Sequence, residues 1–163
     1  MEHFRTSALK EVVRTLTGIA GIEGVAARRR WSYSSGHLPA INTHWAGEQI
    51  ETEHGVPGRR MQMRDAILRV NIVQSTADSP EDDPPEYQLD AWQAEVESRL
   101  AANRTLSGPD GKTSLARDLR LQRTETGESS SSGSGSGSVL VTALFFEVLT
   151  HHREGKPTHP LKD

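Results

Sequence analysis

The sequence predicts an α+β domain: a mainly antiparallel sheet of about five strands packed against two helices, with long flexible loops. Apolar residues recur at helical spacing in two segments, residues 6–20 and 87–102. The runs with strand-like alternation cluster along the chain instead of alternating with helices, which favours antiparallel pairing. With 163 residues, the chain is expected to form a single domain, residues 1–163.

The first predicted helix covers residues 6–20, where apolar residues recur every three or four positions. They are Leu9, Val12, Val13, Leu16 and Ile19. Thr6 or Ser7 is expected to cap its start. Gly18 or Gly21 is expected to end it. Three polar side chains are expected to face water: Lys10, Glu11 and Arg14.

A strand, a turn and a second strand follow in the prediction, over residues 25–33 and 38–45. Pro39 places the start of the second of these strands at an edge or a bulge. Residues 60–75 are a long strand candidate in which the apolar positions change parity at Arg64 and Asp65. We expect a bulge or a bend at that point.

An acidic, proline-rich stretch, residues 77–85, is expected to form an exposed loop before the second helix, residues 87–102. The apolar stripe of that helix consists of Leu89, Trp92, Val96 and Leu100. Residues 107–111 break the chain, and a further strand is expected to start near Leu115 and to end near Glu125.

The last part of the chain combines its most polar and its most apolar segments. Residues 128–138 are a Ser/Gly tract, expected to be a flexible loop, and long loops of this kind are often functional arms or tolerated insertions. Residues 139–149 are the most apolar run, which we place at the sheet centre. Residues 151–163 are polar and are expected to form a tail.

Composition argues against several classes of protein. The net charge of −3 argues against a general nucleic-acid binder, and the absence of cysteine excludes disulfides, thiolate nucleophiles and Cys-based zinc sites. A reducing cytosol fits this composition. Residues 1–20 lack a long apolar core, so a signal peptide is not expected. The longest apolar run is too short to span a bilayer.

No catalytic, metal or cofactor motif is recognisable, and no cofactor is expected. The seven histidines lack metal-ligand spacing, which favours scattered, exposed histidines: His3, His37, His44, His54, His151, His152 and His159. His151 and His152 are neighbours and should point to opposite faces of a strand. The pattern formed by Gly18, Gly21 and Gly24 follows a helix, unlike a phosphate-binding loop.

Two charged clusters remain as candidate contact surfaces. An acidic cluster, Glu81, Asp82, Asp83 and Glu86, fits a metal or catalytic pair less well than a solvated loop with charge at a helix N-terminus, because it lies in a proline-rich loop. A contact with another subunit is a third interpretation. The basic run 28–30 is followed by Trp31 and Tyr33 and fits either nucleic acid or an acidic partner, including the acidic loop of a neighbouring copy. Candidate interface residues are therefore Arg28, Arg29, Arg30, Asp78, Glu81, Asp82 and Asp83.

The chain resembles the tail terminator (tail completion) proteins of long-tailed, non-contractile phages over most of residues 6–152. Residues 9–22 resemble the N-terminal helix of that family, residues 38–41 its second strand, and residues 68–72 its long third strand. Residues 144–148, with Thr150 and His151, resemble its last strand. The Ser/Gly tract and the residues after Glu154 have no counterpart in the resemblance.

The resemblance implies a structural virion protein without enzymatic activity, found in the neck region of the tail and in the host cytoplasm during assembly. It implies a hexameric ring on the head-proximal end of the tail tube, which ends tube polymerisation and joins the tail to the head. The implied partners are other copies of the chain, the tail tube protein and a head-completion or connector protein. The ring leaves room for DNA to pass, without specific nucleic-acid or membrane binding. Two alternatives stay open: another neck or head–tail joining protein, and a small nucleic-acid-binding module.

Overall fold

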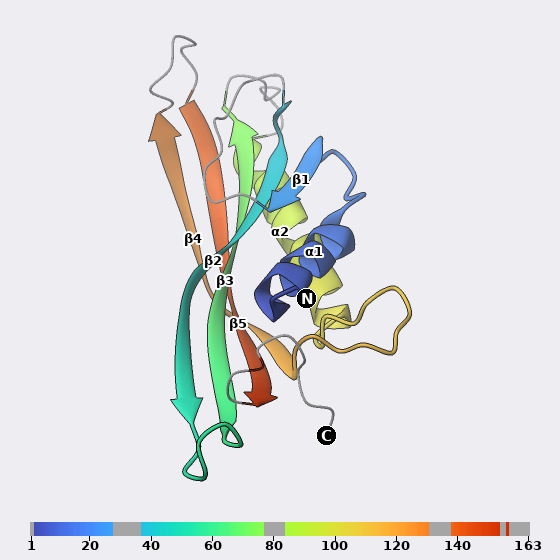
Figure 1. Cartoon of the computed structure of the whole chain (residues 1–163). Coiled ribbons are helices and arrows are strands. Elements are labelled where there is room, and N and C mark those ends of the chain that lie inside the picture. Colours follow the sequence, from blue (N-terminus) through green and yellow to red (C-terminus); the bar gives the residue numbers. More distant parts are fainter. Residues whose placement is uncertain (1, 28–36, 77–83, 131–137, 154–155, 157–163) are drawn as a thin grey trace.

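The computed structural model describes residues 2–27, 37–76, 84–130, 138–153 and 156 (Figure 1). The elements in chain order are α1 (Phe4–Leu16), β1 (Gly24–Ala27), β2 (Ala40–Thr52), β3 (Met61–Ser75), α2 (Pro85–Ala102), β4 (Asp118–Ser130) and β5 (Ser138–Arg153). The five strands form one sheet in the order β1-β2-β3-β5-β4, and both helices pack on the same face of it. The predicted α+β class, with a mostly antiparallel sheet and two helices, is confirmed.

The first two strands are parallel, so the predicted hairpin is wrong. Gly24 lies opposite Ala40, and Ala27 lies opposite Thr43. The chain must therefore return to the level of Gly24 before β2 begins. Parallel neighbours need a connection of about a dozen residues, and residues 28–39 supply it. Alternating apolar residues predict that a segment is a strand, but they carry no information about the direction of its neighbour.

The boundaries of α1 differ from the prediction at both ends. The side chain of His3, and not that of Thr6 or Ser7, caps the helix: its Nδ1 accepts a hydrogen bond from the backbone N–H of Arg5 at 3.2 Å. The helix ends at Leu16, with Thr17 as its C-cap. Gly18 follows with φ of 83°, a conformation that favours glycine and that ends many helices. The prediction that Gly18 ends the helix is confirmed.

The hydrophobic core lies between the helices and one face of the sheet. The two helices and the three long neighbouring strands all contribute fully or almost fully buried residues, among them Val12, Leu16, Ile41, Leu68, Val70, Ile72, Leu89, Val96, Leu100, Leu144, Phe146 and Val148. The predicted stripe of α2 faces this core, with Trp92 half-buried at its rim. The indole N–H of Trp92 donates to the carbonyl of Ala20 at 3.0 Å, which ties α2 to the end of the α1 segment.

The expected bulge at Arg64 and Asp65 is wrong, because β3 pairs with both neighbours without interruption at that point. The bulges lie in the outer strands instead, between Trp45 and Gly47 in β2 and between Leu121 and Arg123 in β4. Apolar residues change parity along β3 for another reason. Its later part packs on the helices, whereas Met63 lies on the opposite face, near the end of the strand, and is 38% exposed.

The last two strands are longer than the sequence indicates. β4 runs to Ser130 and β5 begins at Ser138, so the ends of the predicted Ser/Gly loop belong to the sheet, and residues 131–137 lie outside the described residues. The predicted tail also begins too early, because β5 includes His151–Arg153. β5 is an interior strand, although the middle strand of the sheet is β3. Backbone pairing extends through residues whose side chains carry no apolar pattern.

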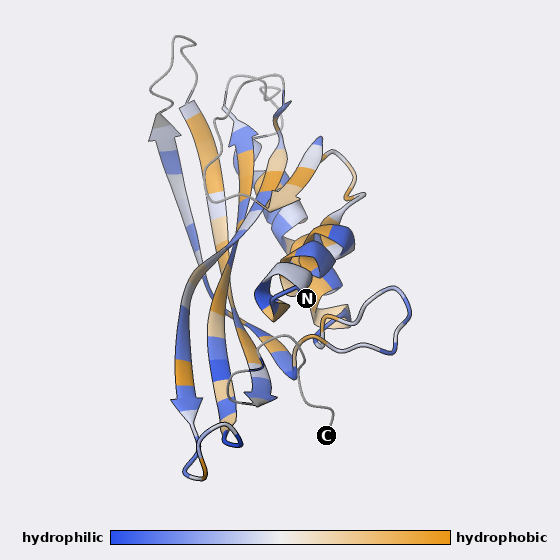
Figure 2. Ribbon diagram, in the orientation of Figure 1, coloured by the Kyte–Doolittle hydropathy of each residue, from blue (hydrophilic) through white to orange (hydrophobic). Residues whose placement is uncertain are grey.

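The sheet is longer than the helical layer that covers it (Figure 1). β2 and β3 extend past the helices at one end of the molecule, and β4 and β5 extend past them at the other. Figure 2 shows that apolar residues concentrate where the strands meet the helices, whereas the turn end of β2 and β3 is largely hydrophilic. At these two ends, no described helix covers the surface of the strands.

The buried face of β5 provides a test of this core. Leu144 is fully buried, whereas Leu121 of the neighbouring strand β4 is 39% exposed. We expect Leu144→Ala to lower the free energy of unfolding by about 2–5 kcal/mol, because it leaves a cavity among core side chains. The matched control Leu121→Ala should cost less than about 1 kcal/mol. Urea unfolding followed by circular dichroism measures both; equal losses would contradict the difference in burial between these two leucines.

Candidate functional site

All seven residues predicted as a subunit interface lie outside the described residues: Arg28, Arg29, Arg30, Asp78, Glu81, Asp82 and Asp83. The basic run follows directly on Ala27, the last residue of β1. The acidic run lies between the end of β3 at Ser75 and the start of α2 at Pro85. A candidate functional surface must therefore be found among the described residues.

The histidines are less exposed than the sequence suggests. His152 is fully buried, and its ring lies 4.5 Å from that of Phe4, between centroids. It is buried because β5 continues through this position on the helix-facing side, while His151 points to the other face, as predicted. No cluster of three or more His, Asp or Glu side chains suited to a metal ion occurs in the described part of the chain.

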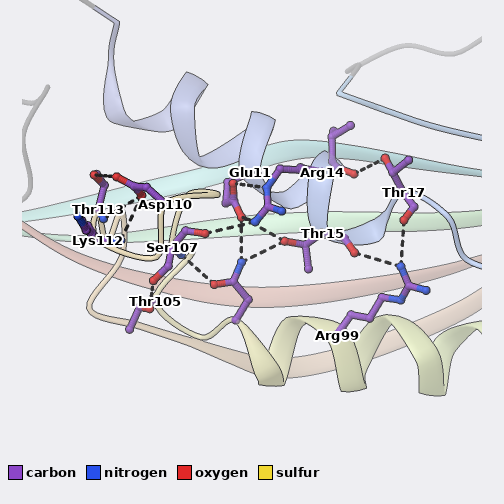
Figure 3. A network of polar contacts seen from close by, with 12 residues as sticks. Glu11, Arg14, Thr15, Thr17, Arg99, Thr105, Ser107, Asp110, Lys112 and Thr113 are labelled. Atoms are coloured by element: carbon purple, nitrogen blue, oxygen red, sulfur yellow. Dashed lines mark hydrogen bonds and ion pairs between the residues drawn. The ribbon is translucent and has the colours of Figure 1, made fainter.

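A polar network joins α1, α2 and the turn after α2 (Figure 3). Glu11 was expected to face water, but it is only 5% exposed, because it lies on the same helical face as Ala8 and Val12. Its carboxylate accepts hydrogen bonds from Arg14 Nε at 2.9 Å and from Asn103 Nδ2 at 3.0 Å. The network satisfies a buried charge.

The side chains of Asn103 and Arg99 make further hydrogen bonds in this network. The side-chain oxygen of Asn103 accepts the N–H of Ser107 at 2.8 Å, which holds the turn after α2. The guanidinium of Arg99 donates to three backbone carbonyls at the end of α1, those of Thr15, Thr17 and Gly18, at 3.0–3.3 Å. Figure 3 shows the contacts with Thr15 and Thr17. A cation at this position compensates the unpaired carbonyls of a helix C-terminus. The network thus fastens the two helices together, which is a structural role.

A pair of carboxyl groups lies on the sheet face that the helices do not cover. Asp65 and Glu147 are diagonal neighbours on β3 and β5, because Asp65 pairs with Leu149 and Ile67 with Glu147. Burial, together with the hydrogen bond and negative charge of Asp65, raises the pKa of Glu147. Gln122 donates to Glu147 Oε2 at 2.9 Å. The charged form of Glu147 is therefore disfavoured beside a second carboxyl group.

On the sheet face that the helices do not cover, two arginines lie against one aromatic ring. Phe145 is 6% exposed, with the guanidinium of Arg69 5.3 Å and that of Arg123 4.2 Å from its ring centroid. Arg69 donates to Asn71 Oδ1 at 2.8 Å, and Arg123 pairs with Glu125 at 3.2 Å. The arginines shield an apolar ring from water on a face without helices.

Hollows lined by described residues lie away from the carboxyl pair. One of about 390 Å³ adjoins Arg69 and Asn71 and includes both Glu125 and Glu128, so it has no consistent charge. Another of about 310 Å³ lies beside α1 and β2, lined by Arg5, Leu9, Ala27, Thr43, His44, Trp45, Ala46, Gly47 and Glu48. Neither combines a deep apolar cavity with converging reactive groups, which is the usual form of a small-molecule site.

The two long edges of the sheet are the most extended surfaces. β4 forms one edge along its whole length. β2 forms the other beyond Thr43, because β1 pairs only with Ala40–Thr43 and no other described strand lies beside it. Each edge carries one large apolar side chain that is exposed to solvent. Ile50 in β2 is 48% exposed, and Leu121 in β4 is 39% exposed. Exposed edges with apolar side chains are typical contact surfaces for another chain.

Sequence reasoning missed these edges because which strand is outermost depends on pairing. Ile50 lies beyond the predicted strand 38–45, and Leu121 lies in a predicted strand whose neighbours were not predicted. Comparison of the chain with protein-family models and with curated protein sequences finds no match in either case. Among the described helices, none is long and apolar enough to cross a membrane.

The helix-joining network predicts a specific loss of stability. We expect Asn103→Ala to lower the free energy of unfolding by about 1–3 kcal/mol, because it removes a donor to the buried Glu11 and the acceptor for Ser107. Gln93→Ala is the matched control, since the side-chain amide of Gln93 donates to Glu97 within α2. This control should cost less than about 1 kcal/mol. Chemical unfolding of both variants measures the difference; similar losses would show that the network contributes no more than a surface contact.

The carboxyl pair predicts a pH dependence. The pKa of Glu147 is raised in the folded chain, so its contribution to stability is complete below its unfolded pKa and is lost as the pH rises through its folded pKa. We therefore expect Glu147→Gln to stabilise the protein at neutral pH and to leave its stability at low pH nearly unchanged. Thermal unfolding between pH 4 and pH 8 measures this. A variant less stable than the parent at neutral pH would contradict the pairing with Asp65.

Proposed function

We propose that this chain is a structural virion protein that forms a ring on the head-proximal end of a phage tail tube. The ring ends tube polymerisation and provides the surface on which the head connector is joined. The proposal starts from the resemblance of residues 6–152 to tail terminator proteins. The observed order of two helices and five strands is compatible with the layout on which that resemblance was based.

The observation that carries the proposal is the presence of two different exposed edges on one sheet. A ring requires each subunit to use two unlike surfaces, one for the preceding copy and one for the next. The edges of β2 and β4 are unlike in sequence and lie on opposite sides of the sheet. A subunit built in this way can bind a neighbour on each side.

The two faces of the subunit also differ, as a ring between tube and connector requires. One face of the sheet carries both helices, and the other carries arginines, carboxyl groups and the aromatic ring of Phe145. A ring of identical subunits would therefore present two chemically distinct surfaces. Such a protein acts by binding and shape, and its polar clusters have the structural roles described above.

The proposal predicts a six-fold ring that caps tubes. Light scattering over a range of concentrations and salt, followed by electron microscopy, should show a hexamer with a central hole, formed in solution or on the ends of added tail tubes. Tubes polymerised in the presence of the protein should stop growing and show capped ends. Continued tube growth with the protein present in excess would contradict the proposal. Salt-sensitive binding to duplex DNA by a protein that leaves the tubes uncapped would instead favour a nucleic-acid-binding module.

A further inference from the structure

The polarity of the sheet allows two copies to join edge to edge. β2 is antiparallel to β3, β3 is antiparallel to β5, and β5 is antiparallel to β4. It follows that β2 and β4 run in opposite directions. A second copy placed alongside in the same orientation therefore brings its β4 antiparallel to β2 of the first. Antiparallel pairing is the more stable arrangement of two strands.

At the exposed edge of β2, some backbone hydrogen-bonding groups point away from β3. The N–H of Glu53 donates to the carbonyl of Met61 in β3 at 2.9 Å. Because these groups alternate along an antiparallel strand, Glu51 also points its groups toward β3, whereas Ile50 and Thr52 point theirs outward. Gln49–Thr52 are all exposed, so a neighbouring strand can reach them.

Exposed apolar side chains on the two edges lie on the same face of the sheet. Ile50 pairs with Arg64, whose guanidinium lies 5.9 Å from the ring centroid of Phe4, on the helix-facing side. Leu121 pairs with Phe146, which belongs to the core between sheet and helices. Continuing the sheet from one copy to the next would bring Ile50 and Leu121 together and remove both from water.

The charges of the two edges are complementary. Residues 48–53 contain three glutamates and no lysine or arginine, whereas residues 119–123 contain two arginines and no acidic residue. Glu51 is exposed and has no ion pair with another described residue. Arg120 is bound to Asp118, but its side chain is 58% exposed, and a guanidinium has donors for a second carboxylate. Each edge would repel its own counterpart and attract the other.

We propose that the β2 edge of one copy pairs with the β4 edge of the next, with Ile50 opposite Leu121 and Glu51 opposite Arg120. Thr52 then lies opposite Leu119. Both bulges, at residues 46 and 122, lie outside this paired segment and limit its length. The contact is head-to-tail, so it repeats from copy to copy. This interface deepens the proposed function and rests on it, because it specifies how copies would join into the ring on the tail tube.

Cysteine cross-linking tests the interface directly, because the chain contains no cysteine of its own. Cross-strand neighbours lie within the range of Cα separations that a disulfide bridges. We expect a mixture of the Ile50→Cys and Leu121→Cys variants to form disulfide-linked heterodimers under mild oxidation. The double variant should form a series of larger covalent oligomers.

Controls separate this contact from random collision. Tyr87→Cys places a more accessible thiol on α2, at a position that is 67% exposed. Mixed with Leu121→Cys, it should give only the background of cross-linking. Glu51→Arg or Arg120→Glu alone should abolish the Ile50–Leu121 cross-link, and the two changes together should restore it. Loss of the cross-link in both single variants without recovery in the combination would refute the proposed register.

Four further outcomes complete the test. Heterodimer yield no higher than that of the Tyr87 control would overturn the interface. Homodimers of Ile50→Cys formed as readily as heterodimers would also overturn it, since the edge would then pair with itself. Failure of the interface is distinguishable from failure of the proposed function. Capped tubes without the cross-link retain the function and reject the interface, whereas cross-linked oligomers that leave tubes growing retain the interface and reject the function.

Discussion

The antiparallel pairing of β3 with β5 is the interaction on which the rest of the structure depends. It runs without interruption from Met61 and Arg153 to Ser75 and Val139, and it aligns the apolar residues of both strands on one face. That face gives the two helices a continuous apolar surface, and burial of this surface supplies the main stabilisation of the fold. β2 and β4 lie on either side of this paired centre and are the outer long strands.

The arrangement of both helices on one face of the sheet also explains where polar and charged side chains are buried. Two helices on one face approach each other closely enough to enclose Glu11, whose charge is then compensated by Arg14 and Asn103. The opposite face has no helix, so arginine side chains cover Phe145 and two carboxyl groups share their surroundings. These clusters are consequences of the layer arrangement, and they leave the sheet edges as the candidate contact surfaces.

Much of the fold could be predicted from apolar spacing, whereas the candidate site could not. The stripes of α1 and α2 and the alternation in β3 were recognised because buried faces impose a period on local sequence, and β5 was recognised as the most apolar run. The interface residues predicted from charge lie outside the described residues. The edge residues Ile50 and Leu121 were missed because exposure depends on which strand lies beside them, a property that no local pattern contains.

By itself, the sequence determined the class of the fold, the two helices, the four long strands and the glycine that ends α1, because each depends on neighbouring residues or on a short repeat. Only the tertiary structure decided that β1 is parallel to β2, that His3 caps α1, that Glu11 is buried, and that β2 and β4 form the edges. Each of these depends on contacts between residues distant in the chain, where pairing of backbone groups and competition for burial select one arrangement among several that local sequence allows.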